Sequence, residues 1–398
     1  LFTTKHHDGF CIWASDETAY DVSGATNYQS GKGDILADIS KACTDFDMDM
    51  GLYLSPWDIH DDSYGYKDAE GNPLVEFADT NGDGKGDTNK PINGLTWQQV
   101  KEQDAKDYNE YYNNQLIEIL GNEKYGNNGR FKEVWMDGAK GSGAGYQEYD
   151  FKKWFDTIQK YEGKAGKFDD DCMLFGAAAY TTVRWIGNEN GFAAEETWSK
   201  SNVNKTDNTI NSNSSGGYTK GFPNGNQWTV PEADARITSG WFWGEGKKTP
   251  KTMEELSEMY FRSVGHNAPL LLNVPPNDKG KVDDAILRRV TEFGTAIKKT
   301  FEKNLAKDAD ISATQVRGND LTYSPQNVLD GKDNTYWTVN DDTKEGTLLI
   351  DLKKETTFDV VSIEESIEFG QRIGKFKVEY QAANGEWKKF DEGTTIGA

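Results

Sequence analysis

The sequence predicts an α/β fold, a (β/α)8-type, TIM-like barrel, followed by an antiparallel β-sandwich. Short apolar runs alternate with runs of helical spacing up to about residue 303, and this order is typical of a parallel sheet. Polar and aromatic residues follow the apolar runs, at the strand ends where barrel enzymes hold their sites. Beyond that point helical spacing disappears. We therefore expect a catalytic barrel in residues 1–303 and a β-sandwich module in residues 306–398.

The first half of the barrel contains five apolar runs that predict strands. In chain order they are LFTT, MGLYLSPWD, FKEVWMDGA, CMLFGA and VRWIGNENG. Helical spacing predicts helices over 34–46, 96–120 and 150–161, with Asp34 as the N-cap of the first. The chain starts inside a predicted strand, so we expect a barrel that is incomplete at its N-terminus.

The second half continues the alternation and ends in a helix. MEELSEMYFRSVGHNA predicts a helix and PLLLNVPPNDKG a strand. One stripe of the closing helix carries Ile286, Val290, Phe293, Ile297 and Phe301. The polar segments 61–96 and 198–227 interrupt the pattern and are expected to be long loops that shape the binding site. In the C-terminal module, ISATQV, GTLLIDL, FDVVSIEES and KFKVEYQA predict strands, and the module is expected to be truncated.

Composition restricts the kind of partner. The net charge is −22, from 66 acidic and 44 basic residues, and nucleic acids and anionic membranes both require clustered cations. No apolar run is long enough to insert into a membrane. The chain has 12 Trp and 18 Tyr, which fits either ordinary core use or stacking on sugar rings. The three cysteines form no CxxC pair, which argues against a zinc or iron–sulfur centre.

The strand ends collect acids, imidazoles and aromatic rings. Asp137 follows one predicted strand, between Trp135 and Gly138, and Glu189 follows another. Other predicted strand ends supply further polar and aromatic side chains, namely His6, His7, Tyr53, Trp57 and Asp58. Glycoside hydrolysis requires two carboxyl groups, one ionised and one protonated, on either side of a sugar. The alternative reading of these residues is structural: capping acids and packed rings.

Five motifs, in this order, resemble the retaining α-L-fucosidases of glycoside hydrolase family 29: TKHHDGFCIW, YLSPWD, VWMDGA, RWIGNENG and LLLNVPPNDKG. SPWD and GNE are more similar to the branch that acts on α-1,3/1,4-linked fucose. The resemblance implies that Asp137 is the nucleophile and Glu189 the general acid/base. It also implies a fucose pocket formed by His6, His7, Trp13, Tyr53 and Trp135, to which PEADARITSGWFW would add Glu232 and Trp241.

The segment DTNGDGKGD resembles a calcium-binding loop. Asp79, Asn81, Asp83 and Asp87 occupy positions 1, 3, 5 and 9 of an EF-hand-like pattern, with a glycine at position 6. Position 12 is Lys90, where a bidentate acid is normal. Calcium that stiffens this loop and a plain solvated acidic turn are both compatible with the pattern, and catalysis itself is expected to need no cofactor.

The C-terminal module resembles galactose-binding-like discoidin domains and family 32 carbohydrate-binding modules, through PQNVLDGKDNTYWTVND and the strands that follow. The whole chain is thus expected to be an exo-acting fucosidase on Lewis-type or milk glycans. The partners would be fucosylated oligosaccharides or glycoconjugates. Alternatives are a fucosidase of other linkage specificity, a glycan-binding protein with a degenerate barrel, and a metal-dependent hydrolase that uses His6, His7 and Asp8. An acidic, cysteine-poor glycan enzyme is typical of secreted or cell-surface bacterial proteins.

Overall fold

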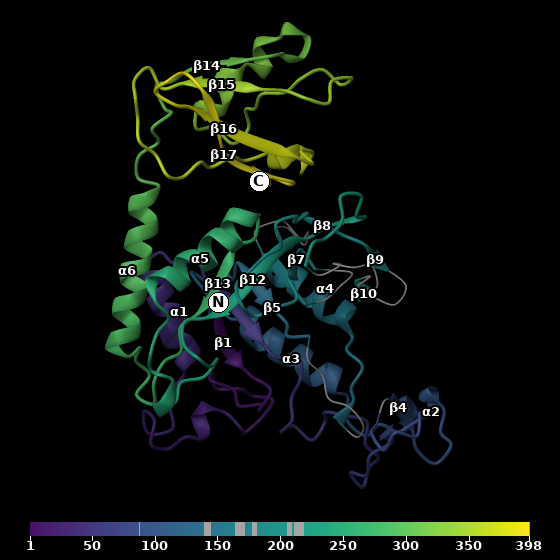
Figure 1. The fold of residues 1–398 in the computed structure, drawn as a ribbon. Helices are drawn as coiled ribbons and strands as arrows, with labels where there is room; N and C mark the ends of the chain where they lie inside the picture. Colours follow the sequence, from purple (N-terminus) through teal and green to yellow (C-terminus); the bar gives the residue numbers. More distant parts are fainter. Residues whose placement is uncertain are drawn as a thin grey trace. The chain divides into compact units, whose positions relative to one another are not determined.

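The computed structural model describes residues 1–86, 88–138, 145–163, 172–176, 181–204, 209–210 and 219–397 (Figure 1). The chain divides into two compact units, Leu1–Val183 and Arg184–Ala398. Among the described residues, none of the helices combines the length and the apolar character needed to cross a bilayer.

The first unit is built on a parallel sheet. Its strands are β1 (Phe2–Lys5), β2 (Gly51–Leu54), β5 (Glu133–Trp135) and β6 (Met173–Phe175), hydrogen-bonded in that order. The apolar residues Phe2, Leu52, Val134 and Leu174 lie side by side in register across the four strands. All four residues of β2 are buried, which is typical of a parallel sheet covered on both faces. These strands confirm four of the predicted strand positions.

Three helices of the first unit pack against this sheet. They are α1 (Ile35–Asp45), α3 (Tyr108–Leu120) and α4 (Phe151–Glu162). The predicted cap is confirmed, because Oδ1 of Asp34 accepts a hydrogen bond from the backbone N–H of Ala37 at 2.9 Å. A short 3-10 helix, η1 (Val22–Gly24), precedes α1. The common core combines strand and helix residues, among them Leu36, Leu52, Leu116, Val134, Trp154 and Ile158.

The single helix predicted over 96–120 is wrong. The structure has two helices there, α2 (Trp97–Gln103) and α3, separated at 104–107. Oδ1 of Asp104 accepts a hydrogen bond from the backbone N–H of Lys67, and Asp107 caps α3 through the N–H of Glu110. The break therefore depends on a partner 37 residues away in the sequence, together with a local cap.

The segment 61–96, predicted to be a loop, contains a hairpin with a small core of its own. β3 (Val75–Ala78) pairs antiparallel with β4 (Thr88–Pro91). The core beside the hairpin combines residues of this segment and of α2, namely Tyr66, Leu74, Val75 and Val100. The prediction missed this hairpin because β4, with the sequence TNKP, has no apolar run that indicates a strand.

The second unit begins within β7 (Val183–Trp185) and contains the parallel pair β12 (Val230–Arg236) and β13 (Leu270–Asn273). Short strand pairs connect β7 to β12: β8 (Lys200–Ser201) with β11 (Gln227–Trp228), and β9 (Val203–Asn204) with β10 (Thr209–Ile210). The helices are η3 (Glu245–Lys247), α5 (Met253–Ser263), η4 (Val264–His266) and α6 (Asp284–Thr300). The core beneath them contains Ala235, Ile237, Leu256, Met259 and Ile286.

The C-terminal part of the second unit has two antiparallel pairs. β14 (Asp310–Ala313) pairs with β15 (Leu348–Asp351), and β16 (Phe376–Gln381) pairs with β17 (Trp387–Gly393). Short 3-10 helices connect them: η5 (Arg317–Asn319), η6 (Leu321–Tyr323), η7 (Pro325–Leu329) and η8 (Ile367–Phe369). The strand predicted from FDVVSIEES is wrong, because residues 358–366 form no strand, and β17 was not predicted.

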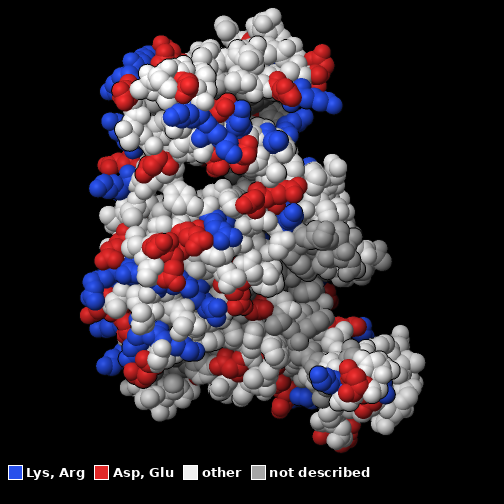
Figure 2. Space-filling view, in the orientation of Figure 1, with Lys and Arg blue, Asp and Glu red and all other residues white. Residues whose placement is uncertain are grey.

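The surface carries mixed charge. In Figure 2, acidic and basic side chains are interspersed over the face in view, so the described basic residues of that face are not gathered into one patch. The observed parallel strands with helices, followed by antiparallel pairs, agree with the predicted class. A closed eight-stranded barrel and a two-layer sandwich stay predictions.

Candidate active site

Asp137 lies in the first unit, two residues beyond the end of β5, and two polar side chains approach its carboxylate. The Tyr53 hydroxyl donates a hydrogen bond to Oδ2 of Asp137 at 2.9 Å, and Nε2 of His7 lies 3.6 Å from the same oxygen. The Asp137 side chain is 28% exposed, so the group is accessible to a ligand. The predicted convergence of β1, β2 and β5 on one site is therefore observed.

Tyr53, which donates to this carboxylate, belongs to a stack of aromatic rings. Tyr53 stacks between His6 and Trp135, with ring centroids 5.7 Å and 5.0 Å away. Trp135 stacks on Phe175 at 4.0 Å, with the two planes 9° apart. Burial raises the pKa of the Tyr53 hydroxyl, and the nearby Asp137 carboxylate raises it further. Tyr53 therefore stays protonated and acts as a hydrogen-bond donor at neutral pH.

The two histidines form a contiguous pair at the end of β1. Their ring centroids are 4.1 Å apart, and His7 also packs against Trp57 at 4.8 Å. Nδ1 of His7 lies 2.7 Å from Oγ of Ser55. Burial lowers the pKa of both imidazoles, although the carboxylates of Asp137 and Asp8 oppose this shift. Both rings are therefore mostly neutral at pH 7, a form that can donate and accept hydrogen bonds.

Asp58 lies in a different environment from the other predicted pocket residues. Its side chain is fully buried, and Oδ2 pairs with the fully buried ammonium of Lys5 at 3.2 Å. Oδ1 accepts hydrogen bonds from the backbone N–H groups of His60 and Asp61. Gly9 has φ +77°, and a Cβ there would lie 2.3 Å from Oδ1 of Asp58. The Asp58 carboxylate therefore connects Lys5, the residue before His6 and His7, to the backbone of residues 60 and 61 that follow the SPWD motif.

Trp13 is also fully buried. Its indole N–H donates a hydrogen bond to Oε2 of Glu118 at 3.0 Å, and its ring belongs to the core of the first unit. A direct contact of Trp13 or Asp58 with a sugar hydroxyl would require movement of buried side chains. Both residues therefore lie outside the proposed pocket.

The second unit contains the other predicted acid. Oε2 of Glu189 accepts a hydrogen bond from the indole N–H of Trp241 at 3.1 Å, and the guanidinium of Arg236 lies 5.5 Å from the Trp241 ring centroid. Glu189 and Arg236 both line a cavity of about 220 Å³. Two of the predicted residues, Glu189 and Trp241, are thereby in contact within this unit.

Glu232, the third residue predicted in this region, lies in β12 and is 7% exposed. Along this strand, charged residues alternate with Ala233 and Ala235, which are fully buried. The indole N–H of Trp185 donates to Asp234 at 2.8 Å on the polar side of the strand. Glu232, Asp234 and Arg236 therefore follow the period of two that puts alternate residues on one face.

Sequence reasoning missed four residues that contact the predicted site residues. They are Ser55, Phe175, Arg236 and Lys5. Strand alternation is the signal that identifies Ser55, because Tyr53, Ser55 and Trp57 are two residues apart and the first two contact Asp137 and His7. The same alternation places the Asp58 side chain on the opposite side of the chain from Tyr53, Ser55 and Trp57, where it meets Lys5. Arg236 is likewise two residues beyond Asp234.

The residues predicted to bind calcium lie in the loop between β3 and β4. Both carboxylate oxygens of Asp79 accept hydrogen bonds from backbone N–H groups, those of Gly82 and Gly84. These bonds lower the pKa of the exposed Asp79 carboxyl. Asp87 lies outside the described residues. No group of three or more His, Cys, Asp or Glu side chains among the described residues is arranged to hold a metal, and calcium binding stays a prediction.

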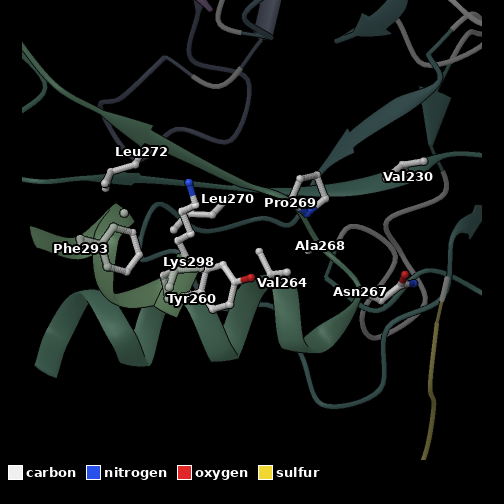
Figure 3. Close-up of a pocket in the computed structure, with 12 residues that line it drawn as sticks. Val230, Tyr260, Val264, Asn267, Ala268, Pro269, Leu270, Leu272, Phe293 and Lys298 are labelled. Carbon is white, nitrogen blue, oxygen red and sulfur yellow. The ribbon is translucent and has the colours of Figure 1, made fainter. Parts of the chain in front are cut away.

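A larger groove, of about 640 Å³, lies elsewhere in the second unit. Figure 3 shows Leu270 and Leu272 of β13 on one side, and Tyr260 of α5 and Phe293 of α6 on the other. Its lining is mostly apolar and includes none of the predicted catalytic or sugar-binding residues. The candidate site is therefore assigned by its chemistry rather than by cavity size.

Comparison with known proteins identifies the family. The alpha-L-fucosidase family model matches residues 1–302, and the F5/8 type C domain model matches residues 310–398. The chain belongs to the alpha-L-fucosidase family. It is accordingly a glycoside hydrolase, as the motif resemblance predicted, and it carries a discoidin-like module.

Relatives come from bacteria and plants. A Ruminococcus gnavus GH29 fucosidase, solved in complex with fucose, is 63% identical over the whole of this chain and 74% of its own, with a TM-score of 0.87. A putative alpha-L-fucosidase from Bacteroides thetaiotaomicron is 29% identical over 99% of this chain and 75% of its own, with a TM-score of 0.75. Alpha-L-fucosidase 1 of Arabidopsis thaliana is 34% identical over all of this chain and 68% of its own length. The chain thus spans about two thirds of that curated relative.

Proposed function

We propose that the protein is a retaining exo-α-L-fucosidase that releases terminal α-1,3/1,4-linked L-fucose from Lewis-type or milk glycans. Membership of the alpha-L-fucosidase family supports the reaction, and the SPWD and GNE motifs support the linkage. A 63% identical relative has been solved with fucose bound. The parallel sheet would belong to a (β/α)8 barrel, and the C-terminal module would have a structural or accessory role. A secreted or cell-surface location in a bacterium would suit glycan substrates.

The observation that carries this proposal is the environment of Asp137. The Tyr53 hydroxyl donates a hydrogen bond to Oδ2, so the carboxylate is held in one orientation at an accessible strand end. A nucleophile requires this kind of preorganisation. The stacked rings of His6, Tyr53 and Trp135 would form a wall against which the apolar C6 methyl group of fucose packs.

The reaction would proceed in two displacements. In the first, a carboxylate oxygen of Asp137 attacks the anomeric carbon, the bond from that carbon to the aglycone oxygen breaks, and the carboxyl proton of Glu189 passes to that oxygen. In the second, the Glu189 carboxylate takes a proton from water, the water oxygen attacks the anomeric carbon, and the ester bond to Asp137 breaks. Two inversions give net retention.

Replacement of Asp137 tests the nucleophile. We expect Asp137→Gly to reduce kcat for an aryl α-L-fucoside by at least about 10⁴-fold, because the covalent step is lost, and we expect azide to restore part of the turnover. Asp62→Gly is the matched control, since Asp62 is an exposed acid of the same unit with an 87% exposed side chain. Unchanged turnover in Asp137→Gly would overturn the assignment.

Replacement of Glu189 tests the general acid. Glu189→Gln should reduce kcat/KM strongly for a natural glycan and much less for an aryl fucoside with an activated leaving group, which departs without protonation. Glu196→Gln is the control, because Glu196 lies seven residues further on and is already paired with Trp198 and Lys220. If only Glu196→Gln gave this leaving-group dependence, the acid would be reassigned.

The linkage and the stereochemistry need one further assay. The enzyme should hydrolyse Lewis trisaccharides much faster than an α-1,2-linked fucoside. NMR of the released sugar should show α-L-fucose first, with the β anomer formed only by mutarotation. Preferential cleavage of the α-1,2 linkage would contradict the specificity, and initial release of the β anomer would contradict the retaining mechanism.

A further inference from the structure

Ser55 connects the SPWD loop to His7 through a chain of two hydrogen bonds. Its Oγ lies 2.7 Å from Nδ1 of His7 and 2.8 Å from the backbone carbonyl oxygen of Trp57. Ser55 is fully buried. Its own backbone N–H donates to the carbonyl oxygen of Lys5 at 2.9 Å, which fixes the serine backbone against the strand that carries the histidines.

The direction of this chain is determined by chemistry. A carbonyl oxygen only accepts, so the single hydroxyl proton of Ser55 points to Trp57. Oγ then offers a lone pair to His7, and Nδ1 of His7 must be the donor. The neutral imidazole consequently carries its proton on Nδ1 and a lone pair on Nε2. That second nitrogen lies 3.6 Å from Oδ2 of Asp137.

We propose that Ser55 is a positioning residue that sets the tautomer of His7, so that Nε2 accepts a hydrogen bond from a donating hydroxyl group of the fucose substrate. This inference rests on the proposed function. In the opposite tautomer, an N–H on Nε2 would point to the Asp137 carboxylate, compete with its attack on the anomeric carbon and leave no acceptor for the sugar.

The other groups around His7 are consistent with this role. The ring faces His6 from the same strand end, Trp57 from the SPWD loop, and the Asp137 carboxylate. The nearby Asp8 carboxylate adds a further negative charge. Tyr53 already donates to Oδ2 of Asp137. An acceptor at Nε2 complements a sugar hydroxyl, which both donates and accepts.

The tautomer can be measured directly by ¹⁵N NMR of the histidine-labelled full chain. The chain has four histidines, and His7→Gln identifies the signals of His7. At pH 8, where the ring is neutral, we expect a protonated Nδ1 and an unprotonated Nε2. Ser55→Ala should shift the population toward the tautomer protonated at Nε2. Ser40→Ala is the control, because Ser40 is a buried serine of the same unit whose Oγ contacts Met50 and Gly126, which lie outside the proposed pocket.

Kinetics provides the second measurement. Ser55→Ala should lower kcat/KM for an aryl fucoside about tenfold or more, because a buried N–H loses its partner and the wrong tautomer is populated. Ser40→Ala should stay within about twofold of the unchanged enzyme. A structural role alone would lower thermal stability in both variants without moving the His7 signals.

Two results would overturn the inference: a neutral His7 protonated at Nε2 in the unchanged protein, or identical His7 signals with and without the Ser55 hydroxyl. The first can be read even where Ser55→Ala does not fold. Failure of the proposed function would look different. The unchanged protein would not hydrolyse fucosides, while the NMR result would still decide the tautomer.

Discussion

The buried ion pair between Lys5 and Asp58 gives the sharpest prediction about stability. Both side chains are fully buried, and Nζ lies 3.2 Å from Oδ2. Nζ also donates to the Gln115 side chain at 2.8 Å. With an effective dielectric constant of 20, Coulomb's law gives an attraction of about 5 kcal/mol at this separation. Removal of one member of a buried pair typically costs about 3–5 kcal/mol, because the other charge is left without compensation.

We expect Asp58→Asn to lower the free energy of unfolding by about 3–5 kcal/mol, since it leaves the Lys5 ammonium buried without a counter-ion. The amide keeps an oxygen for the backbone N–H groups of His60 and Asp61, so the effect reports the charge. Lys5→Met should cost a similar amount. The double variant should cost clearly less than the sum of the two, because neither charge then remains.

Urea denaturation followed by tryptophan fluorescence measures these changes. Lys41→Met is the matched control. It breaks an exposed pair with Asp45, whose side chains are 73% and 54% exposed, and such pairs contribute at most about 1 kcal/mol. A loss of less than about 1 kcal/mol for Asp58→Asn would refute the reasoning. A large rise in KM without loss of stability would instead restore Asp58 as a sugar ligand.

Three other side chains, those of Glu162, Gln371 and Tyr53, affect stability or turnover. Burial raises the pKa of the Glu162 carboxyl to about 7 from 4.5. The free energy of unfolding should therefore fall by about 3 kcal/mol as the pH rises from about 4.5 to 7. Denaturation measured across this pH range should show that Glu162→Gln removes this dependence. Gln371→Ala removes side-chain bonds to the backbone of residues 197 and 199 and should cost about 1–3 kcal/mol of local stability, seen as faster amide exchange there. Tyr53→Phe removes the donor to Asp137 and should lower kcat about tenfold or more, whereas an unchanged kcat would show that this bond does not assist the reaction.

Much of the fold could be predicted because its signals are local. An apolar run such as GLYL forms a buried strand, and Asp34 caps α1 through a residue three positions away. The misses depend on distant partners. The break after α2 uses Lys67, 37 residues before Asp104. The segment 358–366, FDVVSIEES, is not a strand, and no pattern within it shows whether a partner strand lies alongside.

For the candidate site, too, part of the arrangement could be predicted from the sequence and part could not. That His7, Tyr53 and Asp137 would meet could be predicted, because carboxyl ends of neighbouring parallel strands lie at one edge of a sheet. Which way each side chain points depends on the alternation beyond the strand end. Asp58 and Trp57 are neighbours in the sequence, yet one pairs with Lys5 inside the core and the other packs on His7.

This alternation couples the stability of the first unit to the chemistry at its edge. Lys5 is the last residue of β1, and the next two residues are the site histidines. The ion pair that holds Lys5 in the core also ties the SPWD loop to β1, and the same loop orients His7 through Ser55. A variant that weakens the ion pair but leaves the protein folded should therefore loosen the His7–Ser55 contact before it affects Tyr53, whose backbone carbonyl oxygen is held separately by the Thr4 hydroxyl at 2.6 Å. In Asp58→Asn, the tautomer signal of His7 should thus change while the Tyr53–Asp137 bond persists, and unchanged His7 signals would show that the core pair and the site are independent.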